Sequence, residues 1–186
     1  MSSSTDTPLL RVRDLEVTFP PRRGNPAVRA VHGVSFDLEA GQTLALVGES
    51  GSGKTTTGRA ILQLQKASGG SVELLGRDLA AMSGSQVREM RRHMQFVLQN
   101  PHSSLNPRMR IASILSEPLL LHRPIPREQY AAKVDLLLEM VGLDPSMRNR
   151  FPHEFSGGQR QRIVIARALA VDPDFVVFDE AVSALD

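Results

Sequence analysis

The chain has 186 residues, 41% of them hydrophobic, which predicts one globular domain with a sizeable core. Its 22 basic and 20 acidic residues give a formal net charge of +2, so charge alone does not indicate a nucleic-acid partner, and the lack of cysteine excludes disulfides and thiolate metal sites. The N-terminal segment lacks the basic and apolar regions of an export signal, and no run of about 18 apolar residues predicts a membrane span.

Short apolar runs alternate with helical patterns along the chain, which favours an α/β fold. Residues 11–19 and 28–38 are predicted strands that flank the loop "PPRRGNP", typical of an antiparallel β piece before a parallel core. Residues 71–75 and 93–98 are further predicted strands. Between residues 100 and 149 the pattern becomes helical, with breaks at "HRPIP" and "GLDPS", and predicts a helical insertion.

A glycine-rich turn follows the run "QTLALV" at residues 42–47. This run is short, apolar and bounded by Gly41 and Gly48, as expected of a buried parallel strand. Residues 55–65 then carry apolar side chains at helical spacing. The stretch "GESGSGKTTT" between them is therefore predicted to be a strand-to-helix turn.

The turn has the spacing of a phosphate-binding P-loop, in the strand-loop-helix context that this motif requires. Glycines let backbone N–H groups converge on phosphate oxygens, Lys54 can reach the β- and γ-phosphates of ATP, and the Thr55 hydroxyl can bind Mg²⁺. The alternative, a flexible turn that caps an ordinary helix, is the weaker interpretation in this context. The predicted nucleotide-binding residues of the turn are Gly48, Glu49, Ser50, Gly51, Ser52, Gly53, Lys54, Thr55 and Thr56.

The run "DFVVFDE" at residues 174–180 follows a predicted helix and reads as a buried strand that ends in Asp179 and Glu180. The carboxyl ends of such strands are where α/β proteins bind ligands. Asp179 suits a Mg²⁺ site, and Glu180 is placed to polarise a water molecule for attack on the γ-phosphate. An isolated acid pair can simply begin a turn, but together with a P-loop it predicts ATP hydrolysis.

The segment "FSGGQRQR" opens the helix at residues 158–171, which leads to the acidic strand. Ser156 and Gln159 have capping-box spacing, so the simplest interpretation is a well-capped helix. Gly157 and Gly158 would also expose backbone N–H groups in the manner of a P-loop. The chain is therefore predicted to carry a second phosphate-binding surface. A single ATP molecule bound to the chain would not need both surfaces.

With these motifs the chain resembles the nucleotide-binding domain of an ABC transporter over essentially its whole length. The ABC signature is matched by Ser156, Gly157, Gly158 and Gln159, with Phe155 where leucine is commoner. The resemblance implies an ABC-type P-loop fold that binds ATP and Mg²⁺, with two such domains paired head to tail as a homo- or heterodimer. Each P-loop would face the other chain's signature, with two ATP molecules between them.

The resemblance assigns further family elements to single residues. Gln99 matches the Q-loop glutamine, which contacts Mg²⁺, takes part in catalysis and reports to the membrane subunits. The sequence "SALD" at residues 183–186 matches the D-loop and adds Asp186 to the nucleotide contacts. Phe19 is the candidate ring for stacking on adenine, with Phe36, or a plain core role for Phe19, as the alternatives.

Two longer stretches, "LQNPHSSLNPRMRI" and "GQRQRIVIARALAVDPDFVVFDEAVSALD", are similar to the ATPase subunits of bacterial dipeptide, oligopeptide and nickel importers. The residues that distinguish this group of importers are Asn106, Pro107 and Arg108. Ala181 stands where a proline is common after the catalytic glutamate. The resemblance implies a peripheral ATPase at the cytoplasmic face of the inner membrane, bound to permease subunits and served by a solute-binding protein. It does not choose the solute.

A non-transport ABC ATPase, acting on nucleic acid or the ribosome, is the alternative function. Proteins of the repair and cohesin type interrupt the fold with coiled coils or zinc modules, and the chain has neither heptads nor cysteine. An importer subunit with no nucleic-acid partner is therefore the favoured interpretation.

The resemblance predicts one ABC ATPase domain in three parts: a β piece with the P-loop core (1–99), a helical subdomain (100–157), and the signature helix, acidic strand and D-loop (158–186). The family's switch histidine lies beyond the D-loop, so the domain is expected to lack its C-terminal part and to turn over slowly by itself. The histidines present are expected to be ordinary polar residues: His32, His93, His102, His122 and His153.

The chain enters the helical insertion through Gln99 and the Asn106–Arg108 segment. This insertion is expected to contact a short cytoplasmic helix of the permease. Four apolar residues at helical spacing are the candidates to line that contact: Ile111, Ile114, Leu115 and Leu119. The alternative is that they form the insertion's own small core.

Overall fold

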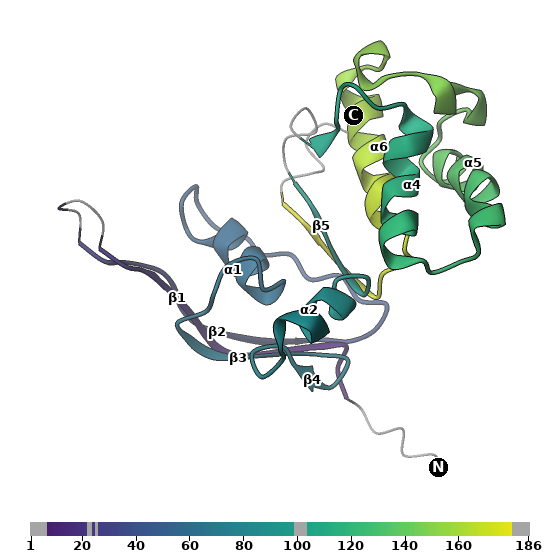
Figure 1. The fold of residues 1–186 in the computed structure, drawn as a ribbon. Coiled ribbons are helices and arrows are strands. Elements are labelled where there is room, and N and C mark those ends of the chain that lie inside the picture. The colour runs from purple at the N-terminus through teal and green to yellow at the C-terminus, as the bar shows by residue number, and fades with distance from the viewer. Residues whose placement is uncertain (1–6, 22–23, 25, 99–103, 180–186) are drawn as a thin grey trace. The chain divides into compact units, whose positions relative to one another are not determined.

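The computed structural model describes residues 7–21, 24, 26–98 and 104–179. The chain divides into two compact units, residues 1–88 and 89–186, and each unit is considered by itself (Figure 1). Both combine strands with helices, which confirms the predicted α/β class. The three-part division of the domain stays a prediction. No helix in the described part of the chain has both the length and the apolar character needed to cross a bilayer.

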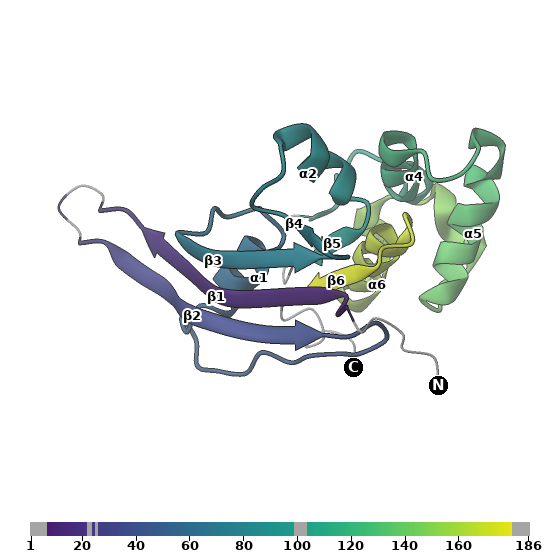
Figure 2. The same cartoon turned by 90° about the horizontal axis from the view of Figure 1, so that it is seen from below.

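The first unit is built on a four-stranded antiparallel sheet with the strand order β2-β1-β3-β4. In Figure 2, β1 lies between β2 and β3, and Leu10 pairs with Leu38 on one side and with Leu74 on the other. The predicted antiparallel β piece is confirmed. The strands are β1 (Leu10–Phe19), β2 (Val28–Leu38), β3 (Gly69–Leu74) and β4 (Arg77–Asp78).

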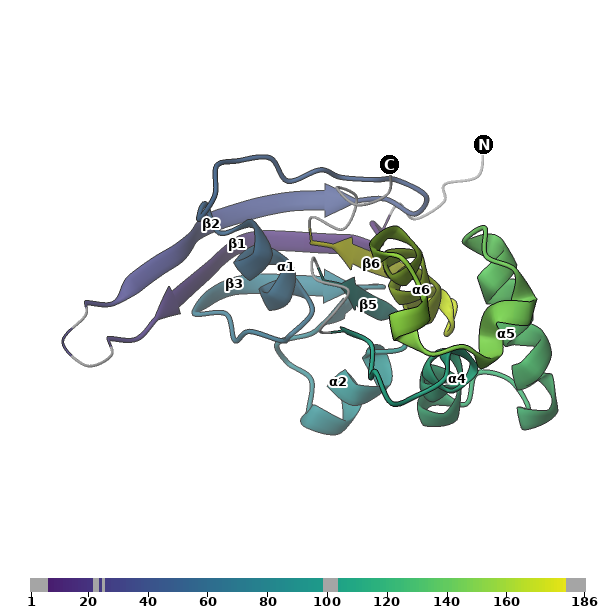
Figure 3. The ribbon, with the colours of Figure 1, turned by 90° about the horizontal axis from the view of Figure 1, so that it is seen from above.

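Strand β1 forms because its apolar residues alternate and can be buried on one face of the sheet. Its buried side chains are Leu10, Val12, Leu15 and Val17, and the alternation shifts by one residue at Asp14, whose φ of 45° marks a bulge. Helix α1 (Lys54–Ile61) contacts β1 and β2 and buries apolar side chains of its own (Figure 3). The glycine-rich turn therefore leads into a helix that is packed against the sheet. Helix α2 (Gly84–Met90) follows β4.

The prediction of a buried strand at residues 42–47 is wrong, because the structure has no strand there. Leu44 is 46% exposed, Leu46 is 42% exposed and Val47 is 94% exposed. A buried strand needs backbone hydrogen-bond partners on both sides. The sheet of the first unit pairs its four strands without this run, so the run has the apolar sequence of a strand but not the partners.

The described part of the second unit combines a two-stranded parallel sheet with three helices of more than ten residues. Strands β5 (Met94–Val97) and β6 (Phe175–Phe178) lie side by side, with Met94 opposite Phe175. The helices are α4 (Ile111–His122), α5 (Tyr130–Met140) and α6 (Gly157–Leu169), and the short 3₁₀ turns are η1 (Arg127–Gln129), η2 (Pro145–Asn149) and η3 (Pro152–Glu154). These elements confirm the helical insertion, its two predicted breaks and the strand that leads to Asp179.

The helices of the second unit enclose an apolar core. Ile111, Ile114, Leu115 and Leu119 of α4 are at most 2% exposed and belong to one cluster with buried side chains of α5 and α6. The hypothesis that these four residues line a contact with a permease helix is therefore wrong. Their alternative role, as the insertion's own core, is confirmed.

Replacing Leu119 by alanine is expected to lower the free energy of unfolding by about 2–5 kcal/mol, because the deletion leaves a cavity in this core. Leu120 is a matched control, since it is the next residue of the same helix but is 52% exposed. Leu120→Ala is expected to change the free energy of unfolding by no more than about 0.5 kcal/mol. Urea unfolding followed by circular dichroism measures both, and equal losses would contradict the core assignment of Leu119.

Candidate functional site

The lysine of the glycine-rich turn folds back over the turn itself. The Lys54 ammonium group donates hydrogen bonds to the carbonyl oxygens of Gly48 and Glu49, each at 2.8 Å. The Thr57 hydroxyl donates to the Gly53 carbonyl at 3.0 Å, within the first turn of α1. The turn, the lysine and the start of the helix are thus one connected structure.

This structure has the chemistry of an anion site. The start of α1 presents N–H groups that have no partner within the helix, together with the positive end of the helix dipole. Residues 48–52 are exposed, so phosphate oxygens can reach these groups. The Lys54 side chain adds a full positive charge next to them. The residues present therefore fit the phosphate chain of a nucleotide.

Gly53 has a structural role that its place in the motif does not reveal. Its φ is +91°, and a Cβ added to it would lie 2.2 Å from the carbonyl oxygen of Ala30 in β2. Gly51 also has a positive φ, +82°, but a Cβ there would meet nothing within 4 Å. The turn therefore approaches the sheet closely at Gly53 and stands clear of it at Gly51.

Alanine at Gly53 is expected to lower the free energy of unfolding by about 2–4 kcal/mol, because it adds backbone strain and a steric clash. Alanine at Gly51 adds only the strain, an expected loss of about 1–2 kcal/mol. Chemical unfolding of the two variants and the parent measures the difference. If Gly53→Ala were no more destabilising than Gly51→Ala, the close approach to Ala30 would be refuted.

The two candidate rings for adenine lie on neighbouring strands of the first unit. Phe19 is the last residue of β1, pairs with Val28 and is 38% exposed. Phe36 lies in β2 opposite Val12 and is half-buried. The greater exposure of Phe19 favours it over Phe36, and its stacking on adenine stays a prediction.

The signature segment forms the N-terminus of α6, and the predicted capping box is confirmed. The Ser156 hydroxyl oxygen accepts a hydrogen bond from Gln159 N at 3.2 Å, and Gln159 Oε1 accepts one from Ser156 N at 3.0 Å. The preceding Phe155 is only 4% exposed and belongs to the helical core, so it fixes the segment to the unit. Gly157 is exposed, and a Cβ added to it would meet nothing within 4 Å, so there is room for a ligand beside its backbone.

Asp179 directly follows β6, where its backbone N donates to the Val97 carbonyl at 3.0 Å. Because β5 and β6 are parallel and in register, their carboxyl ends share one edge, and the half-buried Asp179 lies at this edge. Gln99, Glu180 and Asp186 lie outside the described residues, and their assigned roles stay predictions. The P-loop belongs to the first unit, whereas Asp179 and the signature segment belong to the second.

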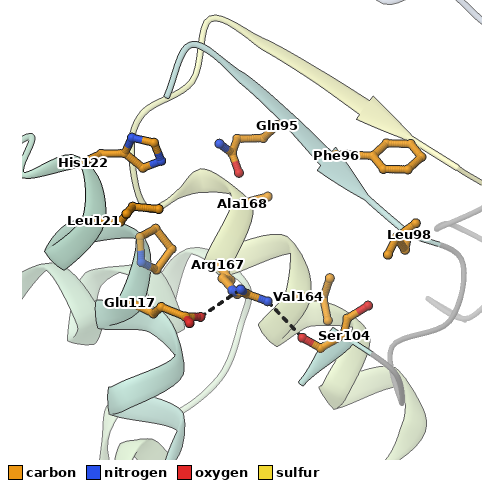
Figure 4. A pocket seen from close by; sticks show the side chains of 11 residues that line it. Gln95, Phe96, Leu98, Ser104, Glu117, Leu121, His122, Val164, Arg167 and Ala168 are labelled. Carbon is orange, nitrogen blue, oxygen red and sulfur yellow. Dashed lines mark hydrogen bonds and ion pairs between the residues drawn. The ribbon is translucent and has the colours of Figure 1, made fainter. Parts of the chain in front are cut away.

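The second unit also contains a groove that the sequence did not predict. It has a volume of 540 Å³ and is lined by β5, the last turns of α4, and α6, as Figure 4 shows. Its apolar lining includes Phe96 and Leu121, and its polar lining includes Gln95 and His122. Leu121 is 73% exposed, so this wall of the groove offers an apolar surface to a partner.

Arg167 of α6 connects three segments in this groove. Its guanidinium donates to the Glu117 carboxylate of α4 at 2.9 Å and to the Ser104 carbonyl at 2.9 Å (Figure 4). The same three residues also line a smaller cavity of 380 Å³ with Asn106 and Pro107. Two of the three residues that distinguish the importer resemblance, Asn106 and Pro107, therefore line a cavity that shares Arg167, Glu117 and Ser104 with the groove.

One of the described histidines, His93, pairs with an aspartate and so joins the starts of the two strands of the second unit. His93 Nδ1 lies 2.7 Å from Asp174 Oδ2, at the starts of β5 and β6. The pKa of His122 lies below its usual value. Burial is the larger cause of this lowering, and the positive charge of Arg92 is the smaller one. His102 lies outside the described residues.

Comparison with family models matches residues 31–183 to the model described as "ABC transporter". The glutathione import ATP-binding proteins GsiA of Escherichia coli and of Shigella boydii are each 52% identical to the chain over 184 residues. Each match takes in 96% of this chain and 30% of the relative. The chain thus spans less than a third of the length of these curated relatives.

Two solved structures resemble the chain over most of its length. The dimeric ATP-binding cassette MJ0796, in a post-hydrolysis state bound to ADP and Pi, has a TM-score of 0.84 at 27% identity, covering 95% of this chain and 76% of that one. CbiO1 of Clostridium perfringens, part of the ABC transporter complex cbiONQ, has a TM-score of 0.81 at 22% identity, covering 97% and 68%. The second likeness shows a shared fold.

Proposed function

The chain belongs to the ABC transporter family, and we propose that it is the ATP-binding part of a subunit that hydrolyses ATP to drive the import of a peptide-like solute. The resemblance to dipeptide, oligopeptide and nickel importers left the solute open. Relatives named for glutathione import favour a peptide over nickel. The subunit would act at the cytoplasmic face of the membrane, with permease subunits and a solute-binding protein.

The observation that carries the proposal is that one chain has two helix starts whose exposed backbone is suited to phosphate. The P-loop presents Lys54 and the start of α1, and the signature segment presents a second helix start, where Ser156 caps α6. One ATP molecule bound within one chain does not need both. A head-to-tail dimer, in which each ATP contacts the P-loop of one copy and the signature of the other, accounts for both surfaces.

Nucleotide binding would be divided among the residues of these surfaces. Lys54 and the P-loop N–H groups would bind the phosphates, and Phe19 would stack on adenine. The Thr55 hydroxyl, the Gln99 amide oxygen and the Asp179 carboxylate are oxygen donors of the kind that Mg²⁺ prefers. Bound there, Mg²⁺ would neutralise charge on the β- and γ-phosphates. Glu180 would orient the attacking water and accept its proton.

The permease contact is proposed for the groove of the second unit and not for the four core residues of α4. An amphipathic helix binds through an apolar face laid in a groove, and the exposed Leu121 on α4 and Phe96 on β5 line opposite sides of this groove with apolar surface. Asn106 and Pro107 line the neighbouring cavity, in a turn where Asn106 Oδ1 accepts a hydrogen bond from Arg108 N at 3.0 Å. The groove also adjoins α6, the helix that carries the signature.

Purification of the protein with its membrane partners tests the proposed function. The expected result is co-purification with permease subunits and ATP hydrolysis that rises when a peptide-loaded solute-binding protein is added. Co-purification with ribosomes or nucleic acid, and no stimulation by any loaded binding protein, would overturn the importer assignment in favour of a non-transport ABC ATPase.

A further inference from the structure

The second unit contains a further cavity at the corner between α4 and α5, where the sequence breaks at "HRPIP" (Figure 1). Its volume is 630 Å³, which lies within the range of sites for small molecules. Its walls come from the end of α4, the connecting segment 123–126, η1 and the start of α5. None of its lining residues also lines the groove, and none is a predicted nucleotide contact.

Two arginines line this cavity and give it a positive charge. Arg123 and Arg127 are both exposed, and within the part of the chain that the structure describes neither side chain makes an ion pair. The acid next to them in the sequence, Glu128, does not line the cavity. Two like charges on one concave surface attract an anion.

The cavity is held in shape at one backbone carbonyl. The Leu119 carbonyl oxygen accepts a hydrogen bond from the Tyr130 hydroxyl at 2.7 Å and a second one from Arg123 N at 2.8 Å. These bonds connect the end of α4, the connecting segment and the start of α5. Pro124 and Pro126 restrict the backbone of the segment further. A ligand therefore meets a wall that is already ordered, which lowers the entropic cost of binding.

Arg123 has a backbone conformation that other residue types adopt more easily. Its φ is 48° and its ψ is 50°, in the left-handed region that glycine and asparagine favour after a helix. Such strained backbone is typical of functional sites. Here it accompanies a side chain that lines the cavity and carries a charge without an ion-pair partner among the described residues.

The lining favours a carboxylate that is attached to an apolar group. The N–H groups of a guanidinium match the two oxygens of a carboxylate. Phosphate sites also use backbone N–H groups, which Pro124 and Pro126 do not have. The remaining walls offer apolar surface, because Leu120 is 52% exposed and the side chains of Ile125 and Tyr130 are half-buried.

We propose that this cavity binds a small organic carboxylate with an apolar group. The carboxylate pairs with Arg123 and Arg127, and the apolar group lies against Tyr130 and Leu120. The site is additional to the nucleotide-binding residues and does not depend on the importer function. A ligand of this class therefore binds in the absence of ATP.

The fluorescence of Tyr130 tests the proposal directly, because the chain has one tyrosine and no tryptophan. N-acetyl-leucine is the probe, since it joins a carboxylate to an apolar group and does not absorb with tyrosine. Titration of the full chain is expected to change the fluorescence in a saturable way. N-acetyl-leucine amide has the same apolar group without the charge, and is expected to bind about tenfold or more weakly.

Substitution of the arginines locates the charge. Arg123→Gln and Arg127→Gln are each expected to weaken binding of N-acetyl-leucine about tenfold or more. Arg91→Gln is the matched control, because Arg91 is an exposed arginine of the same unit that does not line the cavity, and it is expected to leave the affinity unchanged. Circular dichroism shows whether the variants are folded, and the comparison of acid with amide needs no variant.

Four results would overturn the proposal: no saturable change with N-acetyl-leucine, equal affinity for its amide, tighter binding of inorganic phosphate than of the carboxylate, or an equal effect of Arg91→Gln and the two cavity variants. Mg-ATP is expected not to displace the probe, and displacement would assign the anion site to nucleotide instead. Each of the four results leaves the ATP-binding role of the P-loop intact, so the two proposals fail separately.

Discussion

Replacing Lys54 by alanine is expected to weaken Mg-ATP binding about 10- to 100-fold, as measured by isothermal titration calorimetry. The ammonium group lies over the glycine-rich turn, where it donates to two loop carbonyls, and it is the positive side chain predicted to reach the β- and γ-phosphates. Loss of a charged hydrogen bond of this kind accounts for an effect of about this size.

Two controls separate this effect from misfolding and from the loss of one charge. Lys66→Ala removes an exposed lysine of the same unit and is expected to leave the Kd unchanged. Because Lys54 also connects Gly48 with Glu49, circular dichroism and unfolding of Lys54→Ala must match the parent before the affinities are compared. A folded Lys54→Ala variant with the parent's affinity would refute the assignment of the turn as the phosphate site.

Glu180→Gln is expected to lower the rate of ATP hydrolysis by about 10²- to 10⁴-fold, the usual contribution of a general base. The amide keeps the shape of the side chain but cannot accept the proton of the attacking water. ATP binding is expected to persist, so the ATP-bound dimer should accumulate. Steady-state phosphate release gives the rate, and size-exclusion chromatography with ATP gives the dimer.

Asp179→Asn is the matched control, because the two acids are adjacent but have different predicted roles. A Mg²⁺ ligand supports nucleotide binding as well as turnover, so Asp179→Asn is expected to weaken Mg-ATP binding, which Glu180→Gln is expected to leave intact. If both variants lost binding equally, or if Glu180→Gln hydrolysed ATP at the parent's rate, the division of roles between the two acids would be wrong.

Features that depend on local pattern were predictable from the sequence. The bounds of β2 follow from its alternation and the flanking loop, and the capping box of α6 follows from the spacing of Ser156 and Gln159. The P-loop spacing likewise identified a turn that the structure shows held together by Lys54.

Features that depend on distant partners were not predictable. The apolar run at residues 42–47 has the composition of a buried strand, but composition does not specify a neighbouring strand. The apolar face of α4 has the same sequence pattern whether it packs on its own subdomain or on a permease. Arg167 contacts Glu117 and Ser104, which precede it by 50 and 63 residues, so no local pattern indicated the groove.

The capping box of α6 has a consequence for the entropy of assembly. Its two hydrogen bonds use the acceptor oxygens of Ser156 and Gln159, not the hydroxyl hydrogen of the one or the amide NH₂ of the other. The segment assigned to the partner's ATP is thus ordered within the single chain, with these donors still able to bind phosphate. Ordering one residue's backbone costs about 1–2 kcal/mol. In the proposed dimer this turn would add no such cost when ATP binds, and more of the contact free energy would remain to hold the dimer together.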